Sequence, residues 1–228
     1  MYMNVNLAAP AGALAFLGTG LLLFVVGLAL IYSVLRKKPR LKKFALVTIA
    51  LVAGVYLATL LIFSFSSSEK VIVRGEEKHF CEIDCHLAYS ITDVRETKTL
   101  GDAPNQRTAA GVFHVVTIKT RFDENTISRN RGNGLLYPNS RVVTVSDQNG
   151  NQYFPSAEAQ GVLEKSQAAG TPMTIPLRPS ETYSTTLIFD LPSDITSPTL
   201  LIREGNFLTR LLIGHENSFL HKKTRFQI

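Results

Sequence analysis

Charged side chains are absent from two long parts of the chain, residues 1–35 and Phe44–Ser68. Within them, Leu14–Leu35 and Phe44–Phe65 are apolar stretches of 22 residues each. A helix needs roughly 20 residues to cross a hydrocarbon core of ~30 Å. A charge-free stretch of this length would be unusual in a water-soluble core. The two stretches therefore predict a transmembrane helical hairpin over residues 1–68, with helices at about 14–35 and 44–65.

Between these stretches, the loop 36–43 carries six cations within eight residues, and these cations predict the orientation of the hairpin. Lys and Arg are retained on the cytoplasmic side of a membrane, so both termini and everything after residue 68 are expected on the extracytoplasmic, or periplasmic, side. Met1–Ala13 lacks the basic n-region of a signal peptide, so both helices are expected to remain in a bacterial inner membrane. Each cation near anionic lipid adds about 1 kcal/mol of attraction. The six are Arg36, Lys37, Lys38, Arg40, Lys42 and Lys43.

The excess of positive charge is confined to that loop. Residues 69–228 carry 18 basic and 18 acidic side chains, although the whole chain has a formal charge of +6. A nucleic-acid-binding domain needs a basic surface, so nucleic acid is not expected as a partner. Membrane lipid and an integral-membrane protein are the expected partners.

Catalytic motifs are also lacking. The sequence has no Gly-x-Ser-x-Gly nucleophile elbow, no phosphate-binding Gly-x4-Gly-Lys loop and no His-Glu-x-x-His zinc helix. We therefore expect no catalytic residues and no enzymatic activity.

After residue 68 the hydrophobic pattern alternates, as in β-strands. The interval 97–110 has no periodicity and is expected to be a loop. Residues 69–228 are thus predicted to form one extracytoplasmic domain, an all-β immunoglobulin-like sandwich. The expected elements are strands at Val112–Phe122, Arg141–Asp147, Gln152–Phe154, Thr182–Leu191, Thr199–Arg203, Phe207–Ile213 and Phe219–Ile228, a hairpin turn at Asn149-Gly150, and one helix at Ala157–Ala169.

A family resemblance covers about Val112–Ile202. The central strand, the hairpin at Asn149-Gly150 and the stretch LRPSETYSTTLIFDLP at residues 177–192 resemble immunoglobulin-like domains of the small secreted mycobacterial immunoprotective antigen type. They also resemble bacterial lipoprotein and membrane-anchored domains of unknown function. The resemblance implies the sandwich fold and implies no activity, because such folds host many functions.

Both cysteines of the chain lie in the segment HFCEIDCH at residues 79–86, where three kinds of site are conceivable. The simplest is a disulfide between Cys81 and Cys85, because paired extracytoplasmic cysteines are usually oxidised. It would close a very short loop, so its stabilisation falls at or below the low end of ~2–4 kcal/mol. Under this interpretation the protein holds no cofactor. Two free thiols are a further possibility.

A copper site is the second possibility, because thiolates and imidazoles suit copper. The candidate ligands are Cys81, Cys85, His79 and His86, with His215 and His221 from near the C-terminus. The hairpin topology and the Cys-x3-Cys spacing resemble subunit II of haem–copper oxidases. Tyr89 and Thr92 stand where that family has histidine and methionine.

Covalent haem c is the third possibility. Cys81-x3-Cys85-His86 differs by one inserted residue from the Cys-x-x-Cys-His attachment site. Two functional hypotheses follow. The first is a membrane-anchored interaction or accessory subunit of an inner-membrane complex, and the alternative is an electron-transfer subunit that binds copper or haem.

Overall fold

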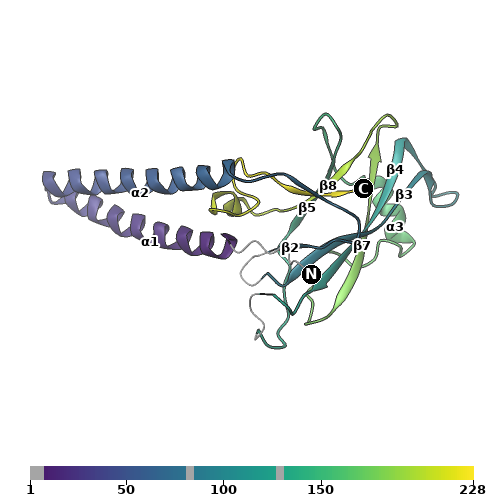
Figure 1. Ribbon diagram of the computed structural model, residues 1–228, viewed down its shortest axis with the longest axis horizontal. Helices are drawn as coiled ribbons and strands as arrows, with labels where there is room; N and C mark the ends of the chain where they lie inside the picture. Colours follow the sequence, from purple (N-terminus) through teal and green to yellow (C-terminus); the bar gives the residue numbers. More distant parts are fainter. Residues whose placement is uncertain (1–7, 81–84, 127–130) are drawn as a thin grey trace. The chain divides into compact units, whose positions relative to one another are not determined.

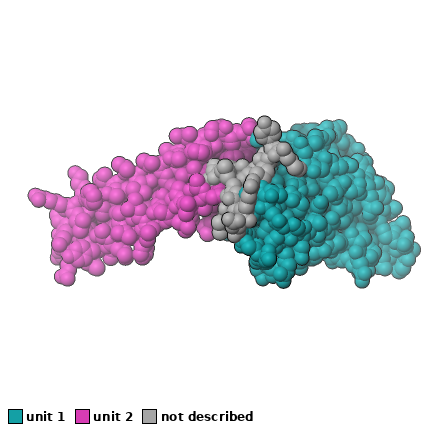
Figure 2. All heavy atoms as spheres, turned by 60° about the horizontal axis from the view of Figure 1, so that its bottom comes forward, with its two compact units in different colours: residues 1–6, 69–206, 223–228 teal, residues 7–68, 207–222 magenta. Residues whose placement is uncertain are grey.

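A computed structural model describes residues 8–80, 85–126 and 131–228. It divides the chain into two compact units (Figures 1 and 2). One unit, residues 7–68 and 207–222, contains the apolar helices. The other, built from residues 69–206 and 223–228, contains the β-strands.

Two helices, α1 at Ala8–Leu35 and α2 at Pro39–Phe65, form a hairpin with a very short turn. The backbone N–H of Lys38 donates to the carbonyl of Ser33 over 2.8 Å, and Lys37 reverses the chain with φ of 50°. Pro39 suits the first position of a helix, where its missing N–H leaves no bond unmade. Both helices are long and apolar enough to cross a membrane.

The basic loop is shorter than the sequence predicts. Because α2 begins at Pro39, three of the six cations lie in its first turns instead of in a loop, and α1 begins six residues before the predicted Leu14. These three cations are Arg40, Lys42 and Lys43. Cations at a helix N-terminus oppose the helix dipole, so their position there is not explained by helix stability.

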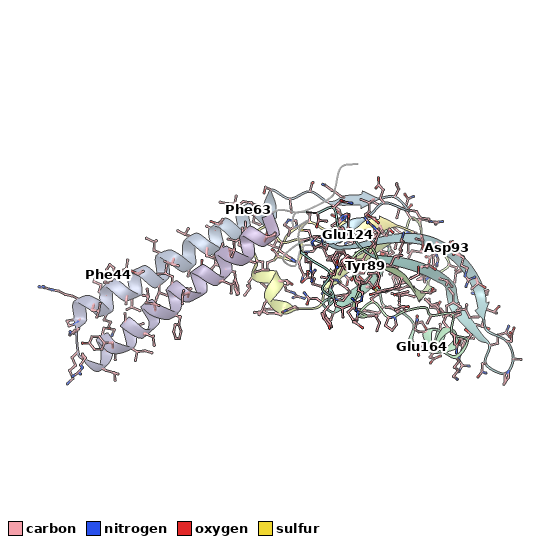
Figure 3. The ribbon with its side chains drawn as sticks, turned by 90° about the horizontal axis from the view of Figure 1, so that it is seen from below. Phe44, Phe63, Tyr89, Asp93, Glu124 and Glu164 are labelled. Carbon is pink, nitrogen blue, oxygen red and sulfur yellow. The ribbon has the colours of Figure 1, made fainter. Side chains whose placement is uncertain are left out.

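Apolar side chains cover the outside of the hairpin, as Figure 3 shows between the labelled Phe44 and Phe63 of α2. Leu14 is 73% exposed and Phe44 is 69% exposed. Along α2, which the structure describes over its whole length, only three residues are buried: Ala45, Leu60 and Ser64.

The C-terminal segment, residues 207–222, belongs to the helical unit and not to the β-domain (Figure 2). The predicted strand Phe207–Ile213 is wrong, because Phe207–Leu211 forms a 3-10 helix, η1. The predicted strand Phe219–Ile228 shortens to β9, Thr224–Gln227. The reason is a tertiary contact: the Tyr56 hydroxyl of α2 donates to the Leu211 carbonyl over 2.7 Å.

Gly12 of α1 allows the same segment to approach. A Cβ at this position would lie 1.9 Å from the carbonyl oxygen of Ile213. We expect Gly12→Ala to destabilise the helical unit by about 1–3 kcal/mol, the usual cost of overpacking. Thermal unfolding of the full chain in detergent measures this. Gly18→Ala is the control, because no atom of the described residues lies within 4 Å of its Cβ position and alanine gains about 1 kcal/mol of helix propensity. Equal stability of the two variants would contradict this packing.

The β-unit is a sandwich of two sheets (Figure 1). One sheet has the strand order β1-β9-β8-β5-β6, and the other has the order β2-β3-β4-β7. Neighbouring strands are antiparallel except β1 and β9, which are parallel. The strands are β1 Lys70–Ile72, β2 Lys78–Phe80, β3 Leu87–Leu100, β4 Arg107–Phe122, β5 Arg141–Ser146, β6 Gln152–Tyr153, β7 Thr182–Leu191, β8 Thr199–Glu204 and β9.

The predicted central strand is confirmed as β4, which pairs with β3 on one side and β7 on the other. The predicted loop at 97–110 is wrong in most of its length, because β3 continues to Leu100 and β4 begins at Arg107. The outer half of β3 is mostly exposed and is interrupted by a register shift between Thr97 and Thr99. Without a buried face, it shows no alternation in the sequence.

The hydrophobic core lies between the sheets, around fully buried side chains such as Tyr89, Phe189 and Phe226. A second cluster covers the other face of the four-stranded sheet, where Leu163 packs with Phe113 and Val115. Leu163 belongs to α3, Ala157–Lys165, which is four residues shorter than predicted. The Ser156 side chain caps this helix by accepting from the Ala159 N–H.

The predicted turn at Asn149-Gly150 is confirmed. Gly150 has φ of 83°, and its N–H donates to the carbonyl of Asp147 over 3.1 Å. The Asp147 carboxylate accepts from the backbone N–H groups of Asn149 and Asn151. This turn joins β5 to β6.

Candidate functional site

The cysteine segment begins on β2 and ends just before β3, and these two strands pair antiparallel. His79 is on β2, and Cys85 and His86 precede β3. Cys85 is fully buried and disulfide-bonded. Cys81 lies outside the described residues, so the pairing of Cys81 with Cys85 stays a prediction.

Strand register brings a polar cluster together beside this segment. His79 pairs with Ala88 of β3, and Ala88 pairs in turn with Arg121 of β4. Such cross-strand neighbours lie on the same face of a sheet. The small Ala88 between them leaves room for the longer side chains. Glu77 and Asp123 follow the same alternation, two residues from His79 and Arg121 respectively.

Asp123 fixes the orientation of His79. Its carboxylate oxygen lies 2.9 Å from Nε2 of His79, and both side chains are buried. A carboxylate can only accept, so Nε2 carries the hydrogen. In the neutral imidazole Nδ1 then carries the lone pair, and this buried atom has no hydrogen-bond partner among the described residues. His79 therefore presents an unsatisfied acceptor inside the protein.

The backbone of the same residue fixes His86. Nδ1 of His86 lies 2.6 Å from the carbonyl oxygen of Asp123 and 2.7 Å from the Thr126 hydroxyl. Because a carbonyl only accepts, Nδ1 carries the hydrogen and Nε2 the lone pair. The ring stacks on Phe122, with a centroid distance of 5.0 Å. Both histidines are thus held in a defined tautomer by one residue.

Arg121 forms ion pairs with both carboxylates of the cluster. It donates to both oxygens of Glu77 over 2.7 and 2.6 Å, and to Asp123 over 2.9 Å. The hydrogen bond from Arg121 lowers the pKa of Glu77. Burial raises the pKa of Asp123, but hydrogen bonds from His79, the Asn125 N–H and Arg121 outweigh it and leave that pKa lowered.

This ion-pair cluster predicts acid sensitivity. A carboxylate whose pKa is lowered by folding contributes stability above its unfolded pKa, which is about 4 for Asp and Glu. That contribution is lost as pH falls through the folded pKa. We expect stability to fall below about pH 5 and Glu77→Gln to make this fall shallower. Urea unfolding of the full chain in detergent at several pH values measures this. Glu164→Gln on the exposed surface of α3 is the control, and equal slopes for both variants would contradict the prediction.

A metal could be held only where ligand atoms converge. Among the described residues, Glu77, His79 and Asp123 are the one group whose ligand atoms lie within 4.8 Å of one another. The guanidinium of Arg121 already occupies both carboxylates and would repel a cation there. The remaining candidate ligand atom of this group is Nδ1 of His79, which does not bond to Asp123.

The other predicted ligands are not members of that group. His215 and His221 belong to the C-terminal segment of the helical unit. Nδ1 of the buried His215 accepts from the Asn217 N–H over 2.9 Å. Nδ1 of His221 lies 2.6 Å from the carbonyl of Lys222, to which it donates.

Sequence reasoning missed Glu77, Arg121 and Asp123. The available signal was charge at alternate positions, Glu77 with His79 and Arg121 with Asp123, the second pair at the end of the expected strand Val112–Phe122. Their convergence depends on the β2–β3–β4 register, which single-strand patterns do not contain. Thr126 follows in a loop and carries no pattern of its own.

No protein-family model and no curated protein sequence matches the chain. Solved structures similar to it include the secreted protein MPT63 of Mycobacterium tuberculosis, with a TM-score of 0.43 and 11% identity over 72% of this chain and 100% of that one. A conserved hypothetical protein of Bacillus anthracis has a TM-score of 0.41 and 14% identity over 57% of this chain and 88% of that one. An uncharacterised β-sandwich protein of Clostridium difficile has a TM-score of 0.40 and 14% identity, over 72% and 96% of the two chains.

These neighbours resemble the chain in fold and carry no functional assignment to it. The sandwich itself follows from the two sheets and their register.

Proposed function

We propose that the protein is a membrane-anchored subunit, in which the helical hairpin crosses a bacterial inner membrane and carries an immunoglobulin-like interaction domain on the extracytoplasmic side. The exposure of the hairpin is the observation that carries this proposal. Each helix contains an apolar stretch of 18 residues. Among the described residues, no residue of the α1 stretch is buried in the protein, and only 6% of the α2 stretch is buried. Apolar surface of this extent is unfavourable in water and needs a bilayer around it.

The charge pattern supports the orientation. The six cations lie between Arg36 and Lys43, at the turn end of the hairpin, where the cytoplasmic surface would retain them. Oxidation of Cys85 fits an extracytoplasmic compartment, because disulfides persist there and are rare in the cytosol. Both observations favour a β-domain outside the cytoplasm.

An interaction role is favoured over catalysis by the chemistry of the polar cluster. Arg121 pairs with both Glu77 and Asp123, so both carboxylates are already held in ion pairs and offer no poised acid–base pair. We therefore propose an accessory subunit without enzymatic activity.

Native electrophoresis of gently solubilised membranes tests the accessory role. We expect the protein to migrate within a complex larger than the detergent-bound monomer, together with an integral-membrane partner identified by mass spectrometry. Migration as a monomer under every mild detergent would contradict this role.

A metal-binding role is the second candidate, favoured by the orphaned Nδ1 of His79. Histidines that bind metals usually donate their other ring N–H to a carboxylate or carbonyl, and Asp123 supplies both acceptors. Copper would suit these imidazoles together with thiolates, which requires prior reduction of the disulfide at Cys85. Haem attachment has less support, because His86 is buried against Phe122.

Thiol counting and copper titration on the detergent-purified chain distinguish the two candidates. The accessory role predicts thiols that titrate only after reduction, and no stoichiometric copper before it. The metal role predicts copper binding that His79→Asn abolishes and the control His221→Asn, at a partly exposed histidine of the other unit, preserves. Stoichiometric binding with this pattern would overturn the preference for a purely accessory role.

A further inference from the structure

The C-terminal segment buries several uncharged polar groups and exposes large apolar side chains, while Arg210 and Glu216 are partly exposed and Lys222 is exposed at its end. Thr209, His215, Asn217 and Ser218 are buried within it. Four large apolar side chains are exposed on its surface: Phe207 is 59% exposed, Leu208 53%, Phe219 43% and Leu220 63%. A water-exposed segment has the opposite arrangement. An apolar exterior around a polar interior is the arrangement expected in lipid.

The interior polar groups bond to one another. The Asn217 amide donates to the Thr209 hydroxyl over 2.6 Å, and the Ser218 hydroxyl donates to the Leu212 carbonyl. The Phe219 backbone N–H donates to the Arg210 carbonyl over 3.1 Å, closing the segment on itself. Non-helical backbone is tolerated at membrane depth only when its polar groups are satisfied within the protein. These bonds satisfy several of the polar groups of the segment within the protein.

The segment also contacts the hairpin well below the end of α2. Tyr56, which bonds to Leu211, lies nine residues before Phe65, or about 13 Å along a helix that rises 1.5 Å per residue. A hydrocarbon core of ~30 Å counted from Phe44, after the last cation, ends near Phe63. Tyr56 then lies roughly 10 Å inside the outer boundary of that core.

The segment returns to the outer end of α2 through Lys222, whose N–H donates to the Ser67 hydroxyl over 2.8 Å. It therefore spans the levels from Ser67 to Tyr56 on the helical unit. The guanidinium of Arg210 lies 5.6 Å from the Phe207 ring centroid. A long cationic side chain in this position can extend along apolar surface to reach lipid headgroups.

We propose that the C-terminal segment is a third membrane-embedded element, which lies in the outer leaflet with Phe207, Leu208, Phe219 and Leu220 among the lipid acyl chains. The inference rests on the proposed membrane anchor. Its occupant is lipid because the apolar surface of the segment continues that of the hairpin within one compact unit.

Tryptophan fluorescence in lipid nanodiscs tests the proposal, since the natural chain contains no tryptophan. Phe207→Trp and Phe219→Trp place the probe on the segment. Leu57→Trp, at a side chain 54% exposed on α2, is the probe for the anchor, and Phe154→Trp, 60% exposed in the β-unit, is the probe for water. Each full-length variant is reconstituted with phosphatidylcholine carrying bromine on its acyl chains, and is separately titrated with iodide in unbrominated nanodiscs.

We expect both segment probes to lose emission to brominated lipid, as Leu57→Trp does, and to resist iodide, while Phe154→Trp shows the reverse. The proposal would be overturned if iodide quenched the segment probes while brominated lipid still quenched Leu57→Trp. The membrane anchor would stand in that case. Segment probes shielded from both quenchers would also overturn it, because protein would then cover the surface. If Leu57→Trp itself escaped the bromine, the membrane anchor would fail.

Discussion

Replacement of the six cations at Arg36–Lys43 by glutamine will place the β-domain on the wrong side of the membrane in a large share of the molecules. Each Lys or Arg near an anionic leaflet contributes about 1 kcal/mol, so the six together contribute several times the ~1.4 kcal/mol that changes an equilibrium tenfold. Acidic residues on the other side of the hairpin offer little compensation, because orientation depends on Lys and Arg and not on net charge.

Reporter proteins fused after Ile228 measure this redistribution. Alkaline phosphatase is active only outside the cytoplasm, whereas green fluorescent protein fluoresces only when it stays inside, because export as an unfolded chain prevents its maturation. We expect phosphatase activity to fall and fluorescence to rise in the glutamine variant. The control makes the same charge change at six exposed cations of the β-unit: Lys70, Arg74, Arg95, Arg107, Lys165 and Arg178. An unchanged phosphatase signal in the loop variant, or an equal loss in the control, would contradict the assigned orientation.

Arg141→Met will destabilise the β-domain by about 3–5 kcal/mol, the usual cost of breaking a buried ion pair from one side. Arg141 lies 3.5 Å from Glu204, and the two side chains are only 1% and 2% exposed. Its guanidinium also lies 4.4 Å from the Phe80 ring centroid. The variant leaves the Glu204 carboxylate buried without the Arg141 cation. The loss of folding stability is therefore larger than the energy of the ion pair itself.

Two variants isolate the effect of burial. Arg225→Met breaks a shorter ion pair, 2.8 Å from a Glu69 side chain that is 53% exposed, and is expected to cost at most about 1 kcal/mol. The double variant Arg141→Met/Glu204→Met is expected to recover most of the loss, because replacing both partners of a buried pair by apolar groups is often neutral. Urea-dependent proteolysis of the full chain in detergent reports these stabilities. A cost for Arg141→Met no larger than that for Arg225→Met would contradict the role assigned to burial of this pair.

The parts predicted correctly from sequence are those with a strong local signal. Absence of charge indicated the two helices, and β-rich or alternating runs indicated β4, β5 and β7. The Asn149-Gly150 pair indicated the turn. The C-terminal segment was predicted wrongly because the short apolar run Phe207–Ile213 was assigned to a strand, whereas it begins with a 3-10 helix and contacts the hairpin through the Leu211 carbonyl. Long-range contacts reveal this, such as the bond from Tyr56, 155 residues away in sequence.

The candidate site was predictable only in part, for a related reason. His79, His86 and both cysteines stand in one short segment, so sequence inspection found them. Arg121 and Asp123 reach His79 only through the pairing of three strands around Ala88. Register is a property of the assembled sheet, and neither composition nor spacing contains it.

Digestion of the full-length protein from each side of the membrane tests the central claim most directly. A membrane-anchored extracytoplasmic domain predicts that protease added to spheroplasts removes the β-domain and leaves a protected fragment containing α1 and α2, and that inverted vesicles protect the domain. It also predicts that alkaline carbonate fails to extract the protein from membranes. Protection of the β-domain in intact spheroplasts, or release of the whole protein by carbonate, would contradict this arrangement.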